Sequence, residues 1–248
     1  MSQDLISNEI AHGEKISRNA EDIWGWSGIV GQKRAERRAR YFVDLGDITH
    51  ERDVLEIGCG TGVFTEKIYK ATEANITAID VSAALLEQAQ QKLPNVKFAV
   101  ENAMFLSFAD CSFDVVYGSS VLHHLDMPLA FEEFYRILRS ARDGSGCGKL
   151  VFAEPNMLNP QIFIQKNVPF IKRWAGDSPD ETAIVRFKTA KLLKKIGYVN
   201  VKIFPYDFLH PVVPKPFVGA FSAFGKTLEK IPLLKEFAGS VIIYAEKY

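Results

Sequence analysis

Residues 54–62 read Val-Leu-Glu-Ile-Gly-Cys-Gly-Thr-Gly, an apolar strand that runs directly into a glycine-rich turn. Glycine has no Cβ, so it tolerates positive φ and lets the backbone come close to a ligand. A helix is predicted to follow over 63–71, with its unpaired amides and the positive end of its dipole directed at the turn. A strand, a glycine turn and a helix N-terminus in this order form a site suited to an anionic group.

The spacing of the glycines separates two kinds of nucleotide-binding turn. The dinucleotide fingerprint Gly-x-Gly-x-x-Gly requires a third glycine at position 63 or 65, where this chain has Val63 and Thr65. The chain instead reads Glu-x-Gly-x-Gly-x-Gly over residues 56–62. This pattern resembles motif I of the class I S-adenosylmethionine (SAM) dependent methyltransferases that act on small molecules. The resemblance implies that the cofactor contacts Glu56, Gly58, Cys59, Gly60 and Gly62. A tight turn without a ligand is the structural alternative.

The next predicted strand, 75–80, ends in Asp80, which follows Gly62 by 18 positions. Ligands of open α/β sheets bind at the carboxyl ends of the strands, so Asp80 is expected to reach the same site. A carboxylate there can accept charge-assisted hydrogen bonds from both ribose hydroxyls. The resemblance implies that Asp80 and the adjacent Val81 bind the cofactor. The alternative is that Asp80 caps the following helix, although Ser82 alone is sufficient for that role.

The third predicted strand, 96–100, is followed by Glu101, Asn102 and Ala103. The family usually has an Asp-Ala pair here, whose carboxylate accepts a hydrogen bond from the adenine amino group. An Asn carbonyl oxygen can accept the same bond. The resemblance therefore implies adenine recognition at Asn102 and Ala103. Asn also favours turns, which is the alternative reading of this position.

The fourth predicted strand, 113–118, leads into Ser119 and then into a histidine pair, His123 and His124. Members of the family often carry two histidines at this point. The resemblance implies that Ser119 lies beneath the methionine part of the cofactor. Histidine can act as a base near neutral pH, so His123 is a candidate to take a proton from an acceptor. The alternative is that the pair serves packing and hydrogen bonding.

The fifth predicted strand, 149–154, ends in Glu154. A carboxylate at the carboxyl end of a central strand faces the acceptor side of the site. Glu154 is therefore a second catalytic candidate, which could orient or deprotonate a nucleophile. It could equally cap the chain that follows.

The composition is that of a globular protein of ordinary α/β size: 248 residues, 47% hydrophobic and 24% charged. Lys and Arg equal Asp and Glu at 30 each, which argues against a dedicated nucleic-acid-binding protein. The densest basic stretch, 33–40, is interpreted as a solvated helix face over a buried stripe of Ala35 and Ala39.

Three cysteines without paired spacing predict neither a metal site nor a disulfide framework. The first residues lack the basic and apolar regions of a signal peptide, and no apolar run reaches the length of a membrane span. We expect a cytoplasmic protein.

Predicted strands and helices alternate along the chain, which predicts an α/β fold with helices on both faces of a mostly parallel sheet. The resemblance implies a Rossmann-like three-layer αβα architecture with seven strands. The last strand would be antiparallel and inserted between strands five and six. The remaining predicted strands are 52–57, 199–204 and 240–246, and the predicted helices are 63–71, 82–92, 127–140 and 188–196.

Three segments fall outside this core of a single methyltransferase domain, 1–248. Residues 1–45 are expected to form helices over the cofactor, with Trp24, Trp26 and Tyr41 as aromatic cover. Residues 156–187 and 205–238 are expected to form a cap on the acceptor side. Their aromatic residues either line an apolar acceptor pocket or pack as a lid or dimer interface. These residues are Phe163, Phe170, Trp174, Phe208, Phe217, Phe221 and Phe224.

The resemblance implies an enzyme that transfers the methyl group of SAM to an oxygen or nitrogen atom of a small acceptor, leaving S-adenosylhomocysteine. The acceptor is expected to be hydrophobic or lipid-linked, and the protein a monomer or homodimer. The reaction is an in-line displacement at a sulfonium, so alignment of the reactants supplies much of the rate. Two alternatives are a SAM-binding regulatory protein without turnover and an NAD(P)-dependent oxidoreductase.

Overall fold

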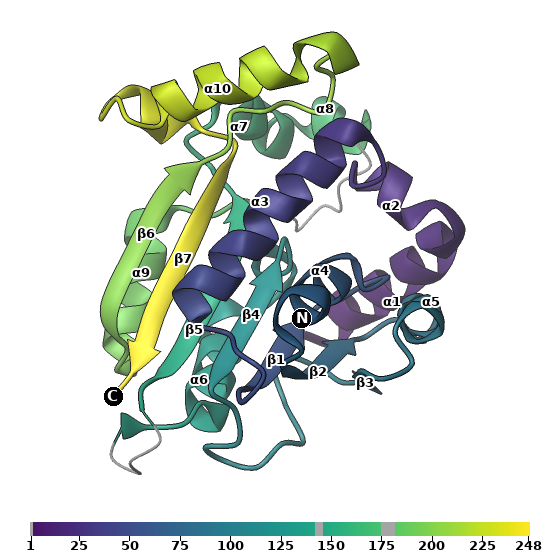
Figure 1. The fold of residues 1–248 in the computed structure, drawn as a ribbon, viewed down its shortest axis with the longest axis vertical. Helices are drawn as coiled ribbons and strands as arrows, with labels where there is room; N and C mark the ends of the chain where they lie inside the picture. The colour runs from purple at the N-terminus through teal and green to yellow at the C-terminus, as the bar shows by residue number, and fades with distance from the viewer. Residues whose placement is uncertain (1, 142–145, 175–181) are drawn as a thin grey trace.

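The computed structural model describes residues 2–141, 146–174 and 182–248, in which seven strands form one sheet with helices on both faces (Figure 1). The strand order is β3-β2-β1-β4-β5-β7-β6. The strands are β1 (Asp53–Ile57), β2 (Asn75–Asp80), β3 (Lys97–Val100), β4 (Val115–Ser119), β5 (Gly148–Pro155), β6 (Val199–Tyr206) and β7 (Ser240–Lys247).

Strand β7 is antiparallel to both of its neighbours, β5 and β6, while β1 to β5 pair in parallel. This confirms the predicted α/β, Rossmann-like architecture and the place of the last strand. The carboxyl ends of β4 and β5 lie toward the top of Figure 1.

Four helices follow strands in the expected way: α4 (Val63–Thr72), α5 (Ala83–Lys92), α6 (Met127–Ile137) and α9 (Arg186–Ile196). Helix α6 ends three residues before its predicted end at 140, because Leu138 leaves helical geometry and forms a β-bridge with Phe113. Ser82 caps α5 by accepting a hydrogen bond from the Leu85 amide at 3.4 Å. This cap is independent of Asp80.

The core divides into two layers because alternate strand residues face opposite sides of the sheet. Val54 packs with Phe42 and Ile68 of α3 (Ile29–Gly46) and α4 on one side. Leu55 packs with Phe134 of α6 on the other side. The predicted stripe of Ala35 and Ala39 is buried in the first layer.

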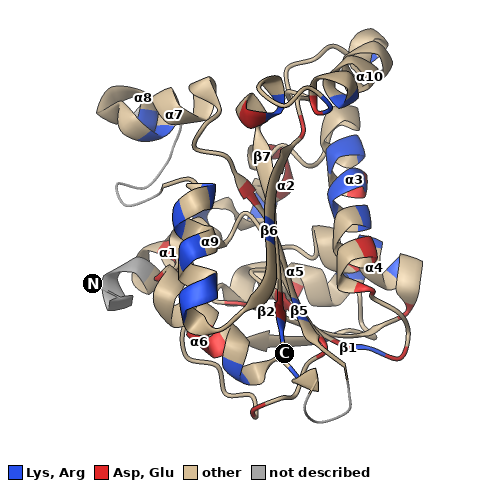
Figure 2. Ribbon diagram, turned by 90° about the vertical axis from the view of Figure 1, so that its left-hand side faces the viewer, with Lys and Arg blue, Asp and Glu red and all other residues tan. Residues whose placement is uncertain are grey.

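Helices α1 (Ser2–Ile16) and α2 (Ala20–Ile23) precede α3 and lie beside the ends of β1 and β2. Two further helical projections rise from the end of the molecule at which the parallel strands finish (Figures 1 and 2). One is α7 (Pro160–Asn167) with α8 (Pro169–Trp174). The other is residues 215–237, in which α10 (Val218–Leu228) lies between the short helical turns η4 (Lys215–Phe217) and η5 (Leu234–Phe237).

Candidate cofactor and acceptor site

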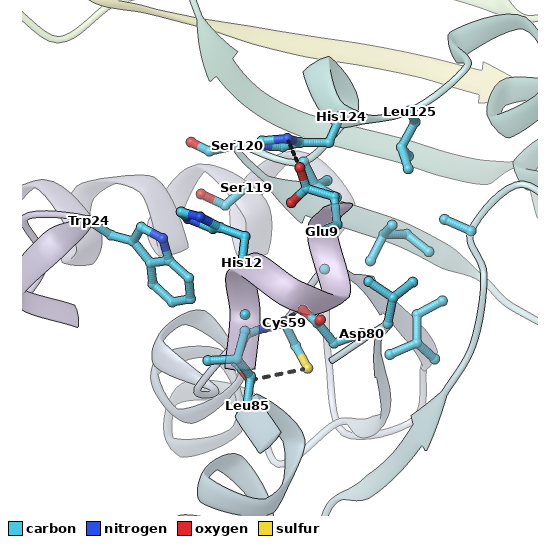
Figure 3. A pocket seen from close by; sticks show the side chains of 18 of the residues that line it. Glu9, His12, Trp24, Cys59, Asp80, Leu85, Ser119, Ser120, His124 and Leu125 are labelled. Carbon is cyan, nitrogen blue, oxygen red and sulfur yellow. Dashed lines mark hydrogen bonds and ion pairs between the residues drawn. The ribbon is translucent and has the colours of Figure 1, made fainter. Parts of the chain in front are cut away.

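A cavity of about 490 Å³ lies at the carboxyl ends of β1, β2 and β4. Its volume is within the range of small-molecule sites. Helix α1 and residues 23–26 cover it, as Figure 3 shows for Glu9, His12 and Trp24. Residues predicted from the sequence that line it are Gly58, Cys59, Gly60, Asp80, Val81, Asn102, Ala103, Ser119 and His123.

The glycine turn approaches the cavity with left-handed backbone at each glycine. Gly58, Gly60 and Gly62 have φ of 65°, 52° and 79°. A Cβ on Gly60 would stand 2.9 Å from the Trp24 ring, so the cover over the turn requires glycine there. Gly62 is absent from the lining, because it begins α4 and faces Ala89 of α5. Its contact with the cofactor therefore stays a prediction.

Asp80 occupies the position expected of a ribose ligand and also holds the turn. Its Oδ2 accepts a hydrogen bond from the Gly60 amide and its Oδ1 accepts one from the Ser82 amide, both at 2.9 Å. Burial raises the pKa of this carboxyl, while the two amide hydrogen bonds oppose the increase. Each carboxylate oxygen retains a second lone pair, so Asp80 has acceptor capacity left for a ligand.

Glu56 does not reach the cavity, contrary to the expectation of a direct contact. The carboxylate is buried in the sheet, where Oε2 accepts hydrogen bonds from Thr65 Oγ1 at 2.5 Å and from the Tyr117 hydroxyl at 2.7 Å. Burial raises the pKa of Glu56 to about 7. Glu56 therefore joins β1 to α4 and β4 behind the glycine turn and supports the shape of that turn.

Asn102 lines the cavity, and its side chain also stabilises the turn that residues 102–105 form after β3. The Oδ1 atom accepts a hydrogen bond from the Met104 amide at 3.0 Å. A second lone pair on the same oxygen remains for a ligand. Both readings of Asn102 are therefore compatible with the geometry.

His123 and Glu154, predicted separately, form one pair. Glu154 is fully buried, and its Oε1 accepts hydrogen bonds from the amides of Val121 and Leu122 at 2.8 and 2.9 Å. Its Oε2 lies 2.7 Å from Nδ1 of His123. A carboxylate accepts hydrogen bonds, so this contact assigns the proton of the neutral ring to Nδ1 and makes Nε2 the basic nitrogen. His123 lines the cavity, whereas Glu154 is absent from its lining.

Arg38 is a buried cation that sequence analysis missed. Its Nη1 donates to the hydroxyls of Ser119 and Ser120 at 2.7 and 3.1 Å, and its other nitrogens donate to Tyr206 and Ser240. The guanidinium carbon also lies 5.0 Å from the centre of the Trp26 ring. The basic stretch 33–40 is thus not a uniformly solvated face. Its composition carried no signal that one arginine would turn inward.

The hydroxyls of Ser119 and Ser120 line the cavity while accepting hydrogen bonds from Arg38. A serine hydroxyl that accepts from a cation has its own proton left to donate. Ser120 has a φ of 56°, an uncommon conformation for a residue other than glycine that often marks functional sites. The pair therefore presents two oriented donors to an oxygen of a bound molecule.

Helix α1 supplies cavity residues that the sequence analysis did not single out. Glu9 and Nδ1 of His124 form an ion pair at 2.9 Å, which ties α1 to the end of β4 (Figure 3). A Cβ on Gly13 would stand 2.6 Å from Ser82 Oγ, so a residue without a side chain lets α1 pack onto α5. In the sequence, the recurrence of apolar or small residues at Ile6, Gly13 and Ile16 could have indicated the face of α1 that packs onto the protein.

The cap aromatics do not line the cavity, contrary to the expectation of an acceptor pocket built from them. Phe163, Phe170, Phe217, Phe221 and Phe224 are each half exposed or more, and Phe208 packs against Gly225 instead. The Trp174 side chain lies outside the described side chains. The N-terminal cover contributes Ile6, Ile16, Ile23 and Trp24 to the lining, beside apolar residues of the core such as Phe64, Ile79 and Met104.

In the ranges that the structure describes, no group of three or more His, Cys, Asp or Glu side chains could hold a metal ion. No described helix is long and apolar enough to cross a membrane. Cys59, Cys111 and Cys147 are free thiols, and burial raises the pKa of Cys59 well above its usual value.

Residues 54–141 match the profile of a family described as a methyltransferase domain. Residues 54–141 therefore carry a methyltransferase domain. The match begins in β1, just before the glycine turn, and ends after α6, so it includes Asp80, Asn102 and the histidine pair.

Two curated methyltransferases resemble the chain beyond this segment. A demethylmenaquinone methyltransferase of Chlorobaculum parvum is 28% identical over 206 residues, which are 78% of this chain and 80% of that protein. A 2-methyl-6-phytyl-1,4-hydroquinone methyltransferase of Synechocystis is 31% identical over 170 residues. This second match covers 65% of this chain and only 51% of the relative, so the chain spans about half the length of that protein.

The methyltransferase fold is also found among solved structures. The N-methyltransferase NodS of Bradyrhizobium japonicum, in complex with S-adenosylhomocysteine, matches with a TM-score of 0.63 and 17% identity. The match covers 97% of this chain and 98% of NodS. At this identity the likeness supports the shared fold and carries no argument about the acceptor.

Proposed function

We propose that this protein transfers the methyl group of SAM to an oxygen atom of a small, largely apolar acceptor that carries a hydroxyl group. The observation that carries the proposal is the buried His123–Glu154 pair at the wall of the cavity. The apolar side chains of the N-terminal cover support an apolar acceptor. Both relatives described above are named for apolar quinone-type compounds, which supports an apolar acceptor.

The residues of the cavity fit SAM. The backbone of Gly58, Cys59 and Gly60 comes close to the site without side chains on its two glycines. Asp80, with Val81 beside it, would hold the ribose hydroxyls, and Asn102 with Ala103 would face the adenine. Ser119 would lie under the methionine part. When bound there, SAM supplies a methyl group on a positively charged sulfur that leaves as a neutral thioether.

His123 acts as the base in this proposal. Its Nε2 takes the proton of the acceptor hydroxyl as the new oxygen–carbon bond forms and the carbon–sulfur bond breaks. Glu154 is a positioning residue, because it holds the Nδ1 proton and fixes the orientation of the ring. Two backbone amides hold Glu154 in turn, so the pair is preorganised.

A kinetic comparison of variants tests this assignment. Candidate acceptors are screened with labelled SAM. They are hydroquinones, phenols and aliphatic alcohols whose hydroxyl groups differ in acidity. For an acceptor with a weakly acidic hydroxyl, His123→Gln is expected to lower kcat by roughly 10²- to 10⁴-fold, with SAM affinity retained. Glu154→Gln should also lower kcat, because an amide donates to Nδ1 and reverses the tautomer of the ring. A phenol that is already ionised should recover most of the lost rate.

His50→Gln provides the matched control, because His50 is 74% exposed and lies before the amino end of β1, away from the cavity. Its kinetics should equal those of the parent. Equal losses for ionised and un-ionised acceptors would overturn the role of His123 as base. Transfer to amines alone would replace the hydroxyl acceptor with a nitrogen acceptor.

A further inference from the structure

Apolar side chains stand exposed on both helical projections at the strand-end face of the molecule. On α7 and α8, Phe163 is 53% exposed and Phe170 is 74% exposed. On the second projection, Phe217, Phe221 and Phe224 are 55%, 50% and 62% exposed. Exposed apolar groups of this kind mark interaction sites. Neither set contributes to the cavity.

The three phenylalanines of the second projection share one face. Their spacing of four and three residues places them on a single stripe of α10 and of the turn before it. The packing of α10 onto the protein uses other positions, the buried Val218 and Gly225. The aromatic stripe is therefore turned away from the core and is not a consequence of packing.

The exposed charge around the stripe is positive. Lys215, Lys226 and Lys230 are exposed. The acids of the same projection are engaged with arginines: Glu229 with Arg37 at 2.5 Å, and Glu236 with an arginine of α9 at 2.7 Å. Figure 2 shows α7, α8 and α10 as mostly tan ribbon with blue segments.

We propose that the α7–α8 and α10 projections dock the protein onto the surface of an anionic lipid bilayer. Aromatic residues beside lysines suit the boundary between headgroups and acyl chains, where apolar burial and attraction to anionic lipid act together. The two projections stand apart at the same end of the molecule in Figure 2, so a flat surface can contact both. A symmetric dimer through this surface would instead bring its lysines against the same lysines of a second copy.

Docking would place the methyl-transfer site beside the bilayer. Gln165 of α7 lines the cavity, so one projection adjoins the site directly. No described helix could span a membrane, so attachment would be to one face of the bilayer. Acceptors that partition into lipid would thus meet the enzyme at the membrane surface. The binding itself does not depend on which acceptor is methylated.

Vesicle sedimentation tests the proposal without SAM or acceptor. The full chain is mixed with vesicles of phosphatidylcholine alone or with one third phosphatidylglycerol, at low and high salt. We expect binding to the anionic vesicles that weakens with salt. The double variant Phe221→Ser with Phe224→Ser should bind the anionic vesicles at least roughly tenfold more weakly than the parent. The double variant Lys226→Ser with Lys230→Ser should bind roughly 30-fold more weakly.

Tyr248→Ser is the matched control, since Tyr248 is 64% exposed at the chain end that lies opposite the projections in Figure 1. Circular dichroism and SAM affinity establish that every variant is folded. Absence of vesicle binding by the parent, or equal binding by all variants, overturns the proposal. A parent that is dimeric in solution, and that the phenylalanine variant makes monomeric, would assign the surface to a second copy instead.

Discussion

Arg38 is a buried cation whose partners among the described residues are hydroxyl groups rather than a carboxylate. Burying a charge is costly unless it is well hydrogen-bonded, so these four hydroxyls stabilise the guanidinium in place. Two of them, Ser119 and Ser120, face the cavity. Arg38 therefore orients the two serine hydroxyls that a ligand in the cavity could contact.

Ser119→Ala and Ser240→Ala separate the ligand role from the structural role of these hydroxyls. Both variants remove one hydrogen bond to Arg38, but only Ser119 lines the cavity. We expect Ser119→Ala to weaken SAM binding by roughly 2- to 10-fold, the value of one ordinary hydrogen bond. Ser240→Ala should leave it unchanged. Calorimetric titration measures both, and equal affinities in the two variants would count against a ligand contact by Ser119.

Glu56 is expected to make the stability of the fold depend on pH. Burial raises its pKa to about 7 from an ordinary 4.5, so the folded chain keeps a proton that the unfolded chain loses between these values. The contribution of Glu56 is therefore fully present below about pH 4.5 and lost as pH rises through 7. The loss amounts to about 3 kcal/mol in the free energy of unfolding.

Urea unfolding at pH 5 and pH 8 measures this dependence. Glu56→Gln keeps an acceptor for Thr65 and Tyr117 but cannot ionise. The parent should lose roughly 2–3 kcal/mol more than the variant between the two pH values. Parallel losses in both proteins would mean that another group dominates the titration.

At the scale of elements, helix α1 covers the cavity and contributes residues to its lining. It is joined to the sheet by the Glu9–His124 ion pair and to α5 by the close approach of Gly13 to Ser82. Glycine at position 13 is required by this approach, since a Cβ would stand 2.6 Å from Ser82 Oγ. Cavity residues on α1 therefore depend on one small residue for their position.

Gly13→Val should displace α1 and weaken SAM binding, with little effect on the core, because α1 contributes few residues to the two main layers. Ala11→Val on the exposed side of the same helix is the control. Stopped-flow measurement should show faster SAM dissociation in Gly13→Val only. Unchanged dissociation in Gly13→Val would mean that α1 does not retain the cofactor.

At the scale of the whole molecule, cofactor binding should stabilise the folded state. A ligand at 100 times its Kd adds about 2.7 kcal/mol to the free energy of unfolding. For a chain of this size that corresponds to an increase in Tm of roughly 5–10 °C. SAM and S-adenosylhomocysteine should produce this increase in a thermal-shift assay, while NAD should not. Stabilisation by NAD alone would contradict the cofactor assignment.

Local signals were sufficient for the architecture. The glycine turn at 58–62, the alternation of apolar strand residues and the Ser82 cap each depend on neighbours within a few positions. Strands β1 to β7 therefore begin and end within two residues of their predicted bounds. The family resemblance added the place of β7 between β5 and β6, which periodicity alone cannot specify.

Contacts between distant residues decided the chemistry of the site. The sequence placed His123 and Glu154 at two strand ends, and only the pairing of β4 with β5 joins them. Arg38 meets Ser119 across 81 positions and Ser240 across 202, and no local pattern distinguishes it from its exposed neighbours. The aromatic residues of α10 are exposed because this helix packs onto the protein through its own Val218 and Gly225. Sequence determined the fold and the cofactor class through local geometry together with the family resemblance. The acceptor side depends on side chains that only folding brings together.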